Sequence, residues 1–340
     1  MRQSSKAALL SNLSLSTLSL SLTLPAKPTF FSTLNPMISS LNDTDGVRIL
    51  STGAGFALLN SCGVLQVTGS DRLEFLHGQL SNDVKGLVLG DVNTSLMLNH
   101  KGHALAQMQV VRRQDDVLLM VEGGQLEEVR AQLERHIIFD QVELTPLPDW
   151  RVFTLQGPRA GEALGVLTLP EKGRFSEANN ALLYPNARTR AGGYDLLFED
   201  STNHLDFQDA DTVSEAALAA ARIAAGIALA HSEAGEGVLP QEAGLEPHVS
   251  YKKGCYLGQE IMARIEARGS LRRSLTGLKL DAAPDSRDIA LDGKKVGRLG
   301  AHAKHPEHGL IALAVLRNDL EGAALQVGNA KAEVLALPLD

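Results

Sequence analysis

"SYKKGCYLGQEIMAR", residues 250–264, places one of the chain's two cysteines between a lysine pair and a tyrosine. Two residues separate that cysteine from Gly258, Gln259 and Glu260. Nearby cations favour the thiolate form of Cys255, which is the reactive form of the side chain. A free cysteine is also common as a small buried apolar residue, so local chemistry leaves both roles open.

The wider window from residue 252 to 273 is basic inside an acidic chain. Its acidic residues are Glu260 and Glu266, and its basic residues are Lys252, Lys253, Arg264, Arg268, Arg272 and Arg273. Such a cluster suits an anionic ligand that also has a flat aromatic part. The alternative is a set of solvated side chains at the edge of a domain.

The pattern of apolar residues changes on either side of this window. DRLEFLHGQL, residues 71–80, has the spacing of a helix, and strand-like runs surround it. The segments that follow the window are short, β-like and separated by Gly, Asp and Asn, which is typical of a small barrel. We predict an α+β fold with units at 37–148 and 149–269 and a C-terminal β-barrel at 270–340. The quoted stretch then lies at a joint between units, where ligand sites are common.

Composition excludes several classes of protein. The formal net charge of −8 argues against a stable nucleic-acid complex. No window approaches the roughly 18 uninterrupted apolar residues of a membrane-spanning helix, so we expect no membrane contact. Cys62 and Cys255 lack zinc spacing and are too few for a four-cysteine cluster, so we expect no metal site. We assign Cys62, which has no charged neighbour, to packing.

Residues 1–36 differ from the rest of the chain. Ser and Leu alternate through much of this segment, and the first acidic residue is Asp43. We interpret the segment as a disordered tail or a mis-assigned start, with Met37 as the true beginning. We therefore predict a cytoplasmic protein, with an organellar location as the alternative if the segment is a transit peptide.

KKGCYLGQE at 252–260, followed by MARIEARG and RRSLTGLKL, resembles the hallmark of YgfZ-type folate-binding proteins, relatives of the glycine cleavage T-protein. Supporting stretches, among them FLHGQLSNDV and GLIALAVLR, extend the resemblance over residues 46 to 338. The resemblance implies a three-part ring of two α+β subdomains, the first of them folate-binding, and a C-terminal β-barrel. It implies tetrahydrofolate or a one-carbon derivative at the centre. It also implies a role in iron–sulfur cluster assembly or repair, with effects on cluster-dependent enzymes that modify transfer RNA.

The motif cysteine is the principal functional residue of that family, so the resemblance assigns the catalytic role to Cys255. The supporting motif residues are Lys253, Gly254, Tyr256, Gly258, Gln259, Glu260 and Arg264. Several have a structural alternative, because glycine serves backbone geometry and Glu260 with Arg264 has the i,i+4 spacing of a helical ion pair. The expected folate contacts are Asn99, Arg222 and Glu242.

Two departures from the T-protein bear on the reaction. The acidic pair that engages folate there corresponds to positions near Ala106 and Gln107 here. The glutamate of its hairpin is absent from AGGYD, residues 191–195. A carboxylate needed for acid–base chemistry is therefore missing, and we expect folate binding without ordinary aminomethyl transfer.

Three functional hypotheses follow. The leading one is a tetrahydrofolate-binding accessory protein whose partners are iron–sulfur assembly or client proteins. The second is a true folate-dependent aminomethyltransferase or demethylase, which would release a one-carbon unit to tetrahydrofolate. The third is a folate-binding or RNA-binding module whose basic window only holds an anion.

Overall fold

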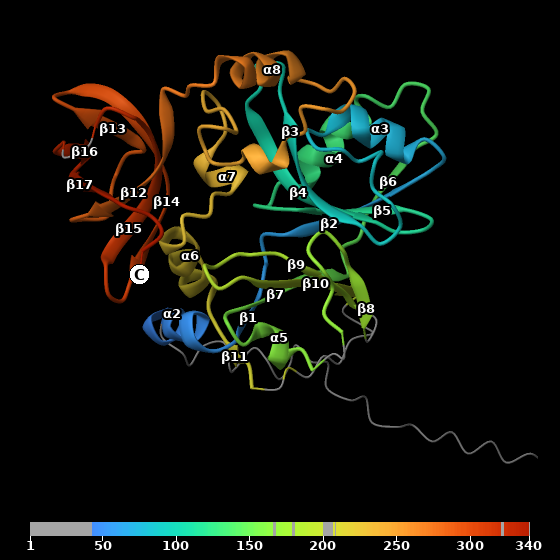
Figure 1. Cartoon of the computed structure of the whole chain (residues 1–340), viewed down its shortest axis with the longest axis horizontal. Helices are drawn as coiled ribbons and strands as arrows, with labels where there is room; N and C mark the ends of the chain where they lie inside the picture. The colour runs from blue at the N-terminus through green and yellow to red at the C-terminus, as the bar shows by residue number, and fades with distance from the viewer. Residues whose placement is uncertain are drawn as a thin grey trace, which may run out of the picture.

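The computed structural model describes residues 43–165, 168–178, 181–199, 207, 209–320 and 323–339. The tail predicted at 1–36 lies outside the described residues. Two sheets face each other and a β-barrel lies beside them, with helices and a long connecting segment between (Figure 1). None of the described helices is long and apolar enough to cross a membrane.

The first sheet has five antiparallel strands in the order β3-β4-β5-β2-β6. Helices α3 (Arg72–Gln79) and α4 (Leu126–Glu134) pack on its outer face through an apolar cluster. In β2, Leu65 faces that cluster and Val64 faces the other side, so both faces of the sheet are buried. The strands are β2 (Gly63–Thr68), β3 (Val92–Leu98), β4 (Ala104–Arg112), β5 (Val117–Val121) and β6 (Glu143–Pro146).

The second sheet has six strands in the order β11-β1-β7-β10-β9-β8. Its inner face packs on the first sheet through a shared core that includes Met120, Tyr184 and Leu197. Its outer face is covered by the short helix α5 (Ala160–Ala163). The strands are β1 (Gly55–Leu58), β7 (Trp150–Gln156), β8 (Ser176–Ala178), β9 (Ala181–Pro185), β10 (Gly193–Glu199) and β11 (Asp211–Thr212).

The start of the described chain belongs to the second sheet, whereas the sequence pattern assigns residues 37–148 to the first unit. β1 pairs with β7 and β11. Helix α2 (Asp43–Thr52) packs on α6 (Glu215–Ala224) beside the same sheet. A Cβ at Gly46 would lie 2.6 Å from the Cβ of Ala217, so a glycine is what allows the two helices to approach. The strand β1, GFAL, carries no sequence signal that identifies its partner strands. The sequence pattern therefore did not reveal that the chain contributes a strand to the second sheet before it enters the first.

Six strands close the C-terminal barrel in the order β12-β15-β14-β13-β16-β17, which confirms the predicted barrel. Leu278, Ile289 and Leu316 lie in its core. Closure pairs both edges of the sheet and so removes a site of unwanted strand pairing. The strands are β12 (Arg273–Leu280), β13 (Asp288–Leu291), β14 (Lys294–His305), β15 (Gly309–Arg317), β16 (Leu325–Val327) and β17 (Ala330–Leu335).

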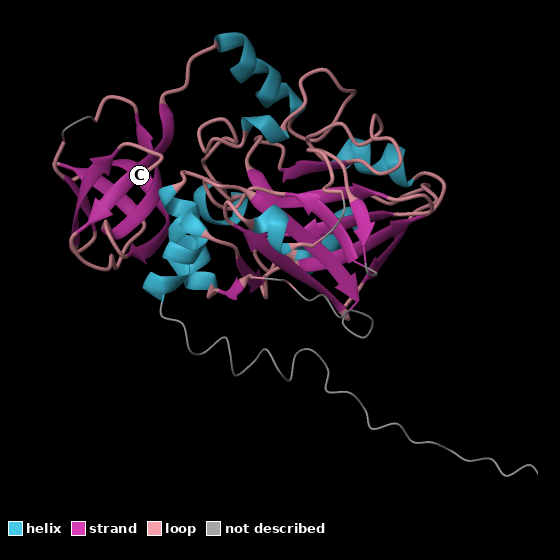
Figure 2. Ribbon diagram, turned by 60° about the horizontal axis from the view of Figure 1, so that its bottom comes forward, coloured by secondary structure: helices cyan, strands magenta, loops and turns pink. Residues whose placement is uncertain are grey.

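A connecting segment between α6 and the barrel crosses the first sheet and carries the sequence motif. Tyr256 and Met262 from this segment share an apolar cluster with Leu96 of β3 and Val315 of β15. The motif therefore lies where the first sheet meets the barrel, and Figure 2 shows its last helix at the edge of the molecule. The elements of the segment are α7 (Ala230–Glu233), the 3-10 turn η1 (Glu246–His248) and α8 (Gln259–Arg268).

Candidate functional site

A cavity of about 440 Å³ opens between the two sheets and the connecting segment. Small-molecule sites commonly have about 300–1,000 Å³, so the cavity has the right size for a ligand of moderate length. β3, β4 and the residue after β5 supply one wall, and β9 with the loop that follows it supplies the opposite wall. The connecting segment closes a third side with residues 227–229 and with Pro247 and His248.

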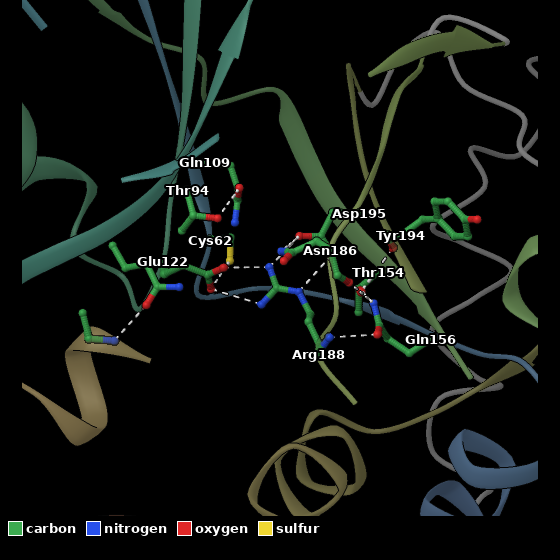
Figure 3. Close-up of polar contacts among 12 residues, drawn as sticks. Cys62, Thr94, Gln109, Glu122, Thr154, Gln156, Asn186, Arg188, Tyr194 and Asp195 are labelled. Atoms are coloured by element: carbon green, nitrogen blue, oxygen red, sulfur yellow. Dashed lines mark hydrogen bonds and ion pairs between the residues drawn. The ribbon is translucent and has the colours of Figure 1, made fainter. Parts of the chain in front are cut away.

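A buried ion cluster forms the inner end of this cavity (Figure 3). Arg188 Nη2 lies 2.7 Å from Glu122 Oε1 and 2.7 Å from Asp195 Oδ2, and Arg188 Nε donates to Asp195 Oδ1 at 2.9 Å. Asp195 also accepts from Asn186 Nδ2 at 2.7 Å. All three charged side chains are more than nine-tenths buried. Two carboxylates and one guanidinium leave the cluster a net charge of −1.

The charges in this cluster hold one another in the ionised state. Burial alone would raise the pKa of Glu122, but the attraction of Arg188 outweighs it, so the pKa of this carboxyl lies below its ordinary value. Burial likewise opposes the charge of Arg188, while Asp195 and Glu122 raise the pKa of its guanidinium. Cys62 donates its thiol hydrogen to Glu122 Oε2 at 3.3 Å. Burial raises the pKa of the Cys62 thiol, and Glu122 raises it further, so this cysteine is a poor nucleophile.

Amide side chains line the wall between the ion cluster and solvent. Gln107 Oε1 accepts from the backbone N–H of Ala230 at 3.0 Å, and Gln109 Oε1 accepts from Thr94 Oγ1 at 2.9 Å. Across the described residues, the amide nitrogens of Gln107 and Gln109 have no protein partner, so both N–H₂ groups are available to a ligand. Such groups suit a flat heteroaromatic ring that carries acceptor atoms.

The solvent side of the cavity carries positive charge. Lys172 and Arg174 are exposed and line the cavity. Arg174 forms an ion pair with Asp91, although 44% of its side chain remains exposed. The cavity is therefore polarised, with net negative charge at its inner end and cations at its rim.

The predicted folate contacts lie in three different places. Arg222 lines the cavity, but its Nη1 is 3.0 Å from Glu233 Oε2 and 2.5 Å from the carbonyl of Ile227. Asn99 lies outside the cavity in a turn, where its Oδ1 accepts from the backbone N–H of Lys101 and of His103. Glu242 also lies outside, in an ion pair with Arg273 at 2.6 Å. The side-chain amide of Asn99 and the carboxylate of Glu242 are thus engaged in local structure.

The structure places the two positions of the lost acidic pair on opposite faces of β4. Ala106 is buried in the outer core, whereas Gln107 lines the cavity. Glu122 lies directly across from Gln107, because its backbone N–H donates to the Gln107 carbonyl at 3.1 Å. A cavity carboxylate is therefore present on the neighbouring strand end, although Arg188 binds both of its oxygens.

The motif loop is anchored to the first sheet by Lys253. Its Nζ donates to the carbonyls of His77, Leu80 and Asn82 at 2.5, 2.5 and 2.9 Å. His77 and Leu80 belong to the last turn of α3, where unpaired carbonyls attract a cation. Burial lowers the pKa of Lys253 to about 8, so the ammonium stays protonated at neutral pH and can donate all three hydrogens.

Two further motif residues have structural roles. The ring of Tyr256 is buried and lies under Lys253, with Nζ 4.7 Å from the ring centroid. Gly258 has φ +86°, and a Cβ there would lie 2.7 Å from the carbonyl oxygen of Asn99. Only glycine fits that conformation and that approach, so Gly258 starts α8 and packs it on the turn at Asn99.

Cys255 is exposed between these anchored neighbours. Lys253 donates hydrogen bonds to backbone carbonyls, and Tyr256 packs in the core. Neither side chain therefore covers the cysteine from solvent. The Gln259 backbone N–H donates to the Tyr256 carbonyl at 3.2 Å, which closes the loop onto α8. In the described chain no ion pair joins Glu260 to Arg264, and both side chains are exposed. Packing explains Lys253, Tyr256 and Gly258, but it does not explain a cysteine at 255.

Sequence reasoning did not select Glu122, Arg188, Asp195 or Tyr184. Glu122 ends the apolar run VLLMV, and a charge directly after a buried strand was the available signal. Arg188 lies in the loop of the β9–β10 hairpin and Asp195 on its second strand, and the shortening of this hairpin drew attention only to a lost glutamate. Among the described residues, no group of three or more His, Cys, Asp or Glu side chains could hold a metal ion.

Comparison with known proteins agrees with this architecture. Residues 28–191 match the family model of the GCVT N-terminal domain. A tRNA-modifying protein YgfZ from Cronobacter sakazakii is 26% identical over 297 residues, covering 78% of this chain and 86% of that protein. An Arabidopsis thaliana protein, named as a candidate chloroplastic transferase, is 24% identical over 77% of this chain, and the match spans only 64% of its length.

A solved structure has the same fold. The glycine cleavage system aminomethyltransferase T from Bartonella henselae superposes with a TM-score of 0.76 over 89% of this chain and 91% of that chain, at 19% identity. The predicted T-protein-like architecture, with a closed C-terminal barrel, is confirmed. The resemblance to YgfZ-type proteins that the motif predicts is confirmed as well.

Proposed function

We propose that this chain, which resembles YgfZ-type proteins and has the fold of a glycine cleavage aminomethyltransferase, binds a reduced folate in the central cavity. The observation that carries the proposal is the polarity of that cavity. Its inner end offers a carboxylate cluster and free amide N–H₂ groups, and its rim offers Lys172 and Arg174. A folate has the complementary order, with a ring rich in donors and acceptors at one end and carboxylates at the other.

This arrangement sets the orientation of the ligand. The pterin ring carries N–H groups that a buried carboxylate such as Glu122 accepts, and acceptor atoms for the N–H₂ groups of Gln107 and Gln109. The glutamate tail then extends toward Lys172 and Arg174, whose charges attract carboxylates. Arg222, already paired with Glu233, lines the wall between the two ends. Tetrahydrofolate or a one-carbon derivative fits this description.

The second part of the proposal concerns Cys255. An exposed thiol on a loop that is anchored on both sides is available to a partner protein or a small thiol-reactive group. We assign to Cys255 the functional step by which the protein assists iron–sulfur cluster assembly or repair, and through it the enzymes that modify transfer RNA. The relatives named as tRNA-modifying proteins support this assignment. The proposed location is the cytoplasm, with an organelle as the alternative.

A paired experiment tests both parts. Reduced folate is titrated into the wild type and Cys255→Ala, and each protein is tested for rescue of cluster-dependent enzyme activity in cells that lack it. We expect equal folate binding and rescue by the wild type alone. Equal rescue by Cys255→Ala would refute the role of the cysteine.

A matched pair of lysine variants tests the orientation of the ligand. Lys172→Glu should weaken folate binding by roughly tenfold, because it reverses the charge at the rim. Lys252→Glu, at another exposed lysine that lies outside the cavity, should leave binding unchanged. Equal effects of the two changes would show that the tail does not bind at this rim.

The alternative function is a folate-dependent aminomethyltransferase or demethylase, and Glu122 is the observation that favours it. Glu122 supplies a cavity carboxylate close to the position where the acidic pair is missing. Its ion pair with Arg188 keeps it deprotonated but occupies both oxygens, which makes it a weak proton acceptor. Release of a one-carbon unit from an aminomethyl or N-methyl substrate to tetrahydrofolate by the purified protein would establish the alternative.

A further inference from the structure

The side of the central cavity that the connecting segment closes consists of uncharged residues. They are Ile227, Ala228, Leu229, Pro247 and His248, here called the uncharged wall. Pro247 is exposed, and Ile227, Leu229 and His248 keep part of their surface accessible, so the wall offers surface to a ligand. Burial lowers the pKa of His248 to about 4, and its imidazole is therefore neutral at pH 7.

The two large aliphatic side chains of the uncharged wall are not used by the core. Of the apolar clusters that the described residues form, none includes Ile227 or Leu229. Ala228 between them packs in the cluster that also holds Tyr256. Apolar surface that is left in contact with water gains free energy when a ligand covers it. Core packing therefore does not explain these two side chains, whereas an apolar part of a ligand would.

Backbone contacts hold both parts of the uncharged wall in place. The carbonyl of Ile227 accepts from Arg222 Nη1 at 2.5 Å, and Arg222 is itself paired with the buried Glu233. The carbonyl of His248 accepts from Ser81 Oγ at 2.6 Å. A surface that is fixed before the ligand arrives loses little conformational freedom on binding, which favours affinity.

The cavity thus combines three kinds of surface. Carboxylates and amides form its inner end, Lys172 and Arg174 form its rim, and the uncharged wall closes the side. A folate also has three parts, which are a pterin, a glutamate tail and an uncharged aminobenzoyl ring between them. The inner end and the rim match the pterin and the tail, which leaves the aromatic ring for the remaining surface.

We propose that the uncharged wall binds the aromatic ring that joins the pterin to the tail, and so makes the cavity select folates over pterins that lack this ring. This inference rests on the proposed folate function. Aliphatic side chains and a flat neutral imidazole suit the face of an aromatic ring, because both cover it without a charge that would have to lose its water.

Matched substitutions and two ligands test the inference. Ile227→Asn places an amide on the uncharged wall, whereas Ile227→Leu keeps the wall apolar. Ile138→Asn is the control, since Ile138 is 74% exposed and does not line the cavity. Each protein is titrated calorimetrically with 5-formyltetrahydrofolate and with 6-methyltetrahydropterin, which has the pterin but neither the aromatic ring nor the tail.

We expect Ile227→Asn to raise the Kd for 5-formyltetrahydrofolate about tenfold, because an amide gains less than an aliphatic side chain when a ring covers it. Its affinity for 6-methyltetrahydropterin should equal the weaker affinity of wild type. Ile227→Leu and Ile138→Asn should bind both ligands like wild type.

Three results would overturn the inference and leave the proposed function standing. One is wild-type affinity of Ile227→Asn for 5-formyltetrahydrofolate. Another is an equal loss of affinity for the two ligands, because a change confined to the wall should spare a ligand without the ring. The third is a similar loss in Ile227→Leu. Absence of saturable binding of 5-formyltetrahydrofolate to wild type would overturn the proposed function and this inference together.

Discussion

Arg188 Nη2 lies 2.7 Å from Glu122 Oε1, and this ion pair joins the β9–β10 hairpin of the second sheet to the end of β5 in the first. The same guanidinium holds Asp195 within its own sheet. The inner end of the cavity is therefore built from both sheets, and its geometry depends on how they are stacked.

Replacing Arg188 by Met should destabilise the protein by about 3–5 kcal/mol, because two buried carboxylates would lose their common partner. Urea unfolding measures the change in free energy. Arg159→Met serves as the control, since Arg159 pairs with Glu162 at an exposed site where ion pairs contribute about 0–1 kcal/mol. Similar losses of unfolding free energy in the two variants would mean that burial does not determine how strongly the Arg188 cluster stabilises the protein.

His248, which lines the cavity, should make stability depend on pH. Burial lowers the pKa of His248 from 6.5 to about 4 in the folded protein. As pH falls, the imidazole is protonated in the unfolded chain before it is protonated in the folded protein. The stability that neutral His248 allows is therefore complete above pH 6.5 and is lost as pH falls toward 4. The loss reaches at most roughly 3 kcal/mol.

The His248→Gln variant separates this effect from the titration of carboxyl groups. Its unfolding free energy should change less than that of wild type between pH 6.5 and pH 4.5. Urea unfolding at four pH values provides the comparison. Parallel curves of unfolding free energy against pH for wild type and His248→Gln would show that His248 is protonated to the same extent in the folded and unfolded states.

The two cysteines should differ in reactivity toward iodoacetamide. Cys255 is exposed, whereas burial raises the pKa of the Cys62 thiol and Glu122 holds its hydrogen. We expect alkylation of Cys255 to be faster on the order of a hundredfold, as mass spectrometry of timed samples would show. The Cys255→Ala protein should lose the fast phase and keep the stability of wild type. Fast modification of Cys62 in the folded protein would contradict the structure around Glu122.

Lys253→Met should loosen the motif loop. Three carbonyls of the first unit would lose their donor, which we expect to cost about 2 kcal/mol of unfolding free energy. Hydrogen exchange should speed up in residues 250–258 while the barrel strands stay protected. Lys252→Met, at an exposed neighbouring lysine, should change neither quantity. Unchanged exchange in Lys253→Met would show that Tyr256 and Gly258 hold the loop without it.

Local signals were sufficient to predict the C-terminal barrel, because its short strands follow one another in the chain. The contiguous motif string singled out Cys255 and its neighbours, and their functional role stays a prediction. The ion cluster was not predictable in the same way. Glu122 and Arg188 are 66 residues apart, and their pairing depends on how two sheets stack. Asn99 and Glu242 illustrate the converse, since their residue types suited a ligand but local partners engage them.

The most direct test of the central claim is a crystal structure of the protein with 5-formyltetrahydrofolate bound. The account predicts the pterin ring beside Glu122, Gln107 and Gln109 in the central cavity, with the carboxylates of the tail near Lys172 and Arg174. A ring bound at another site, or bound here with its carboxylates at the Glu122 end, would contradict it.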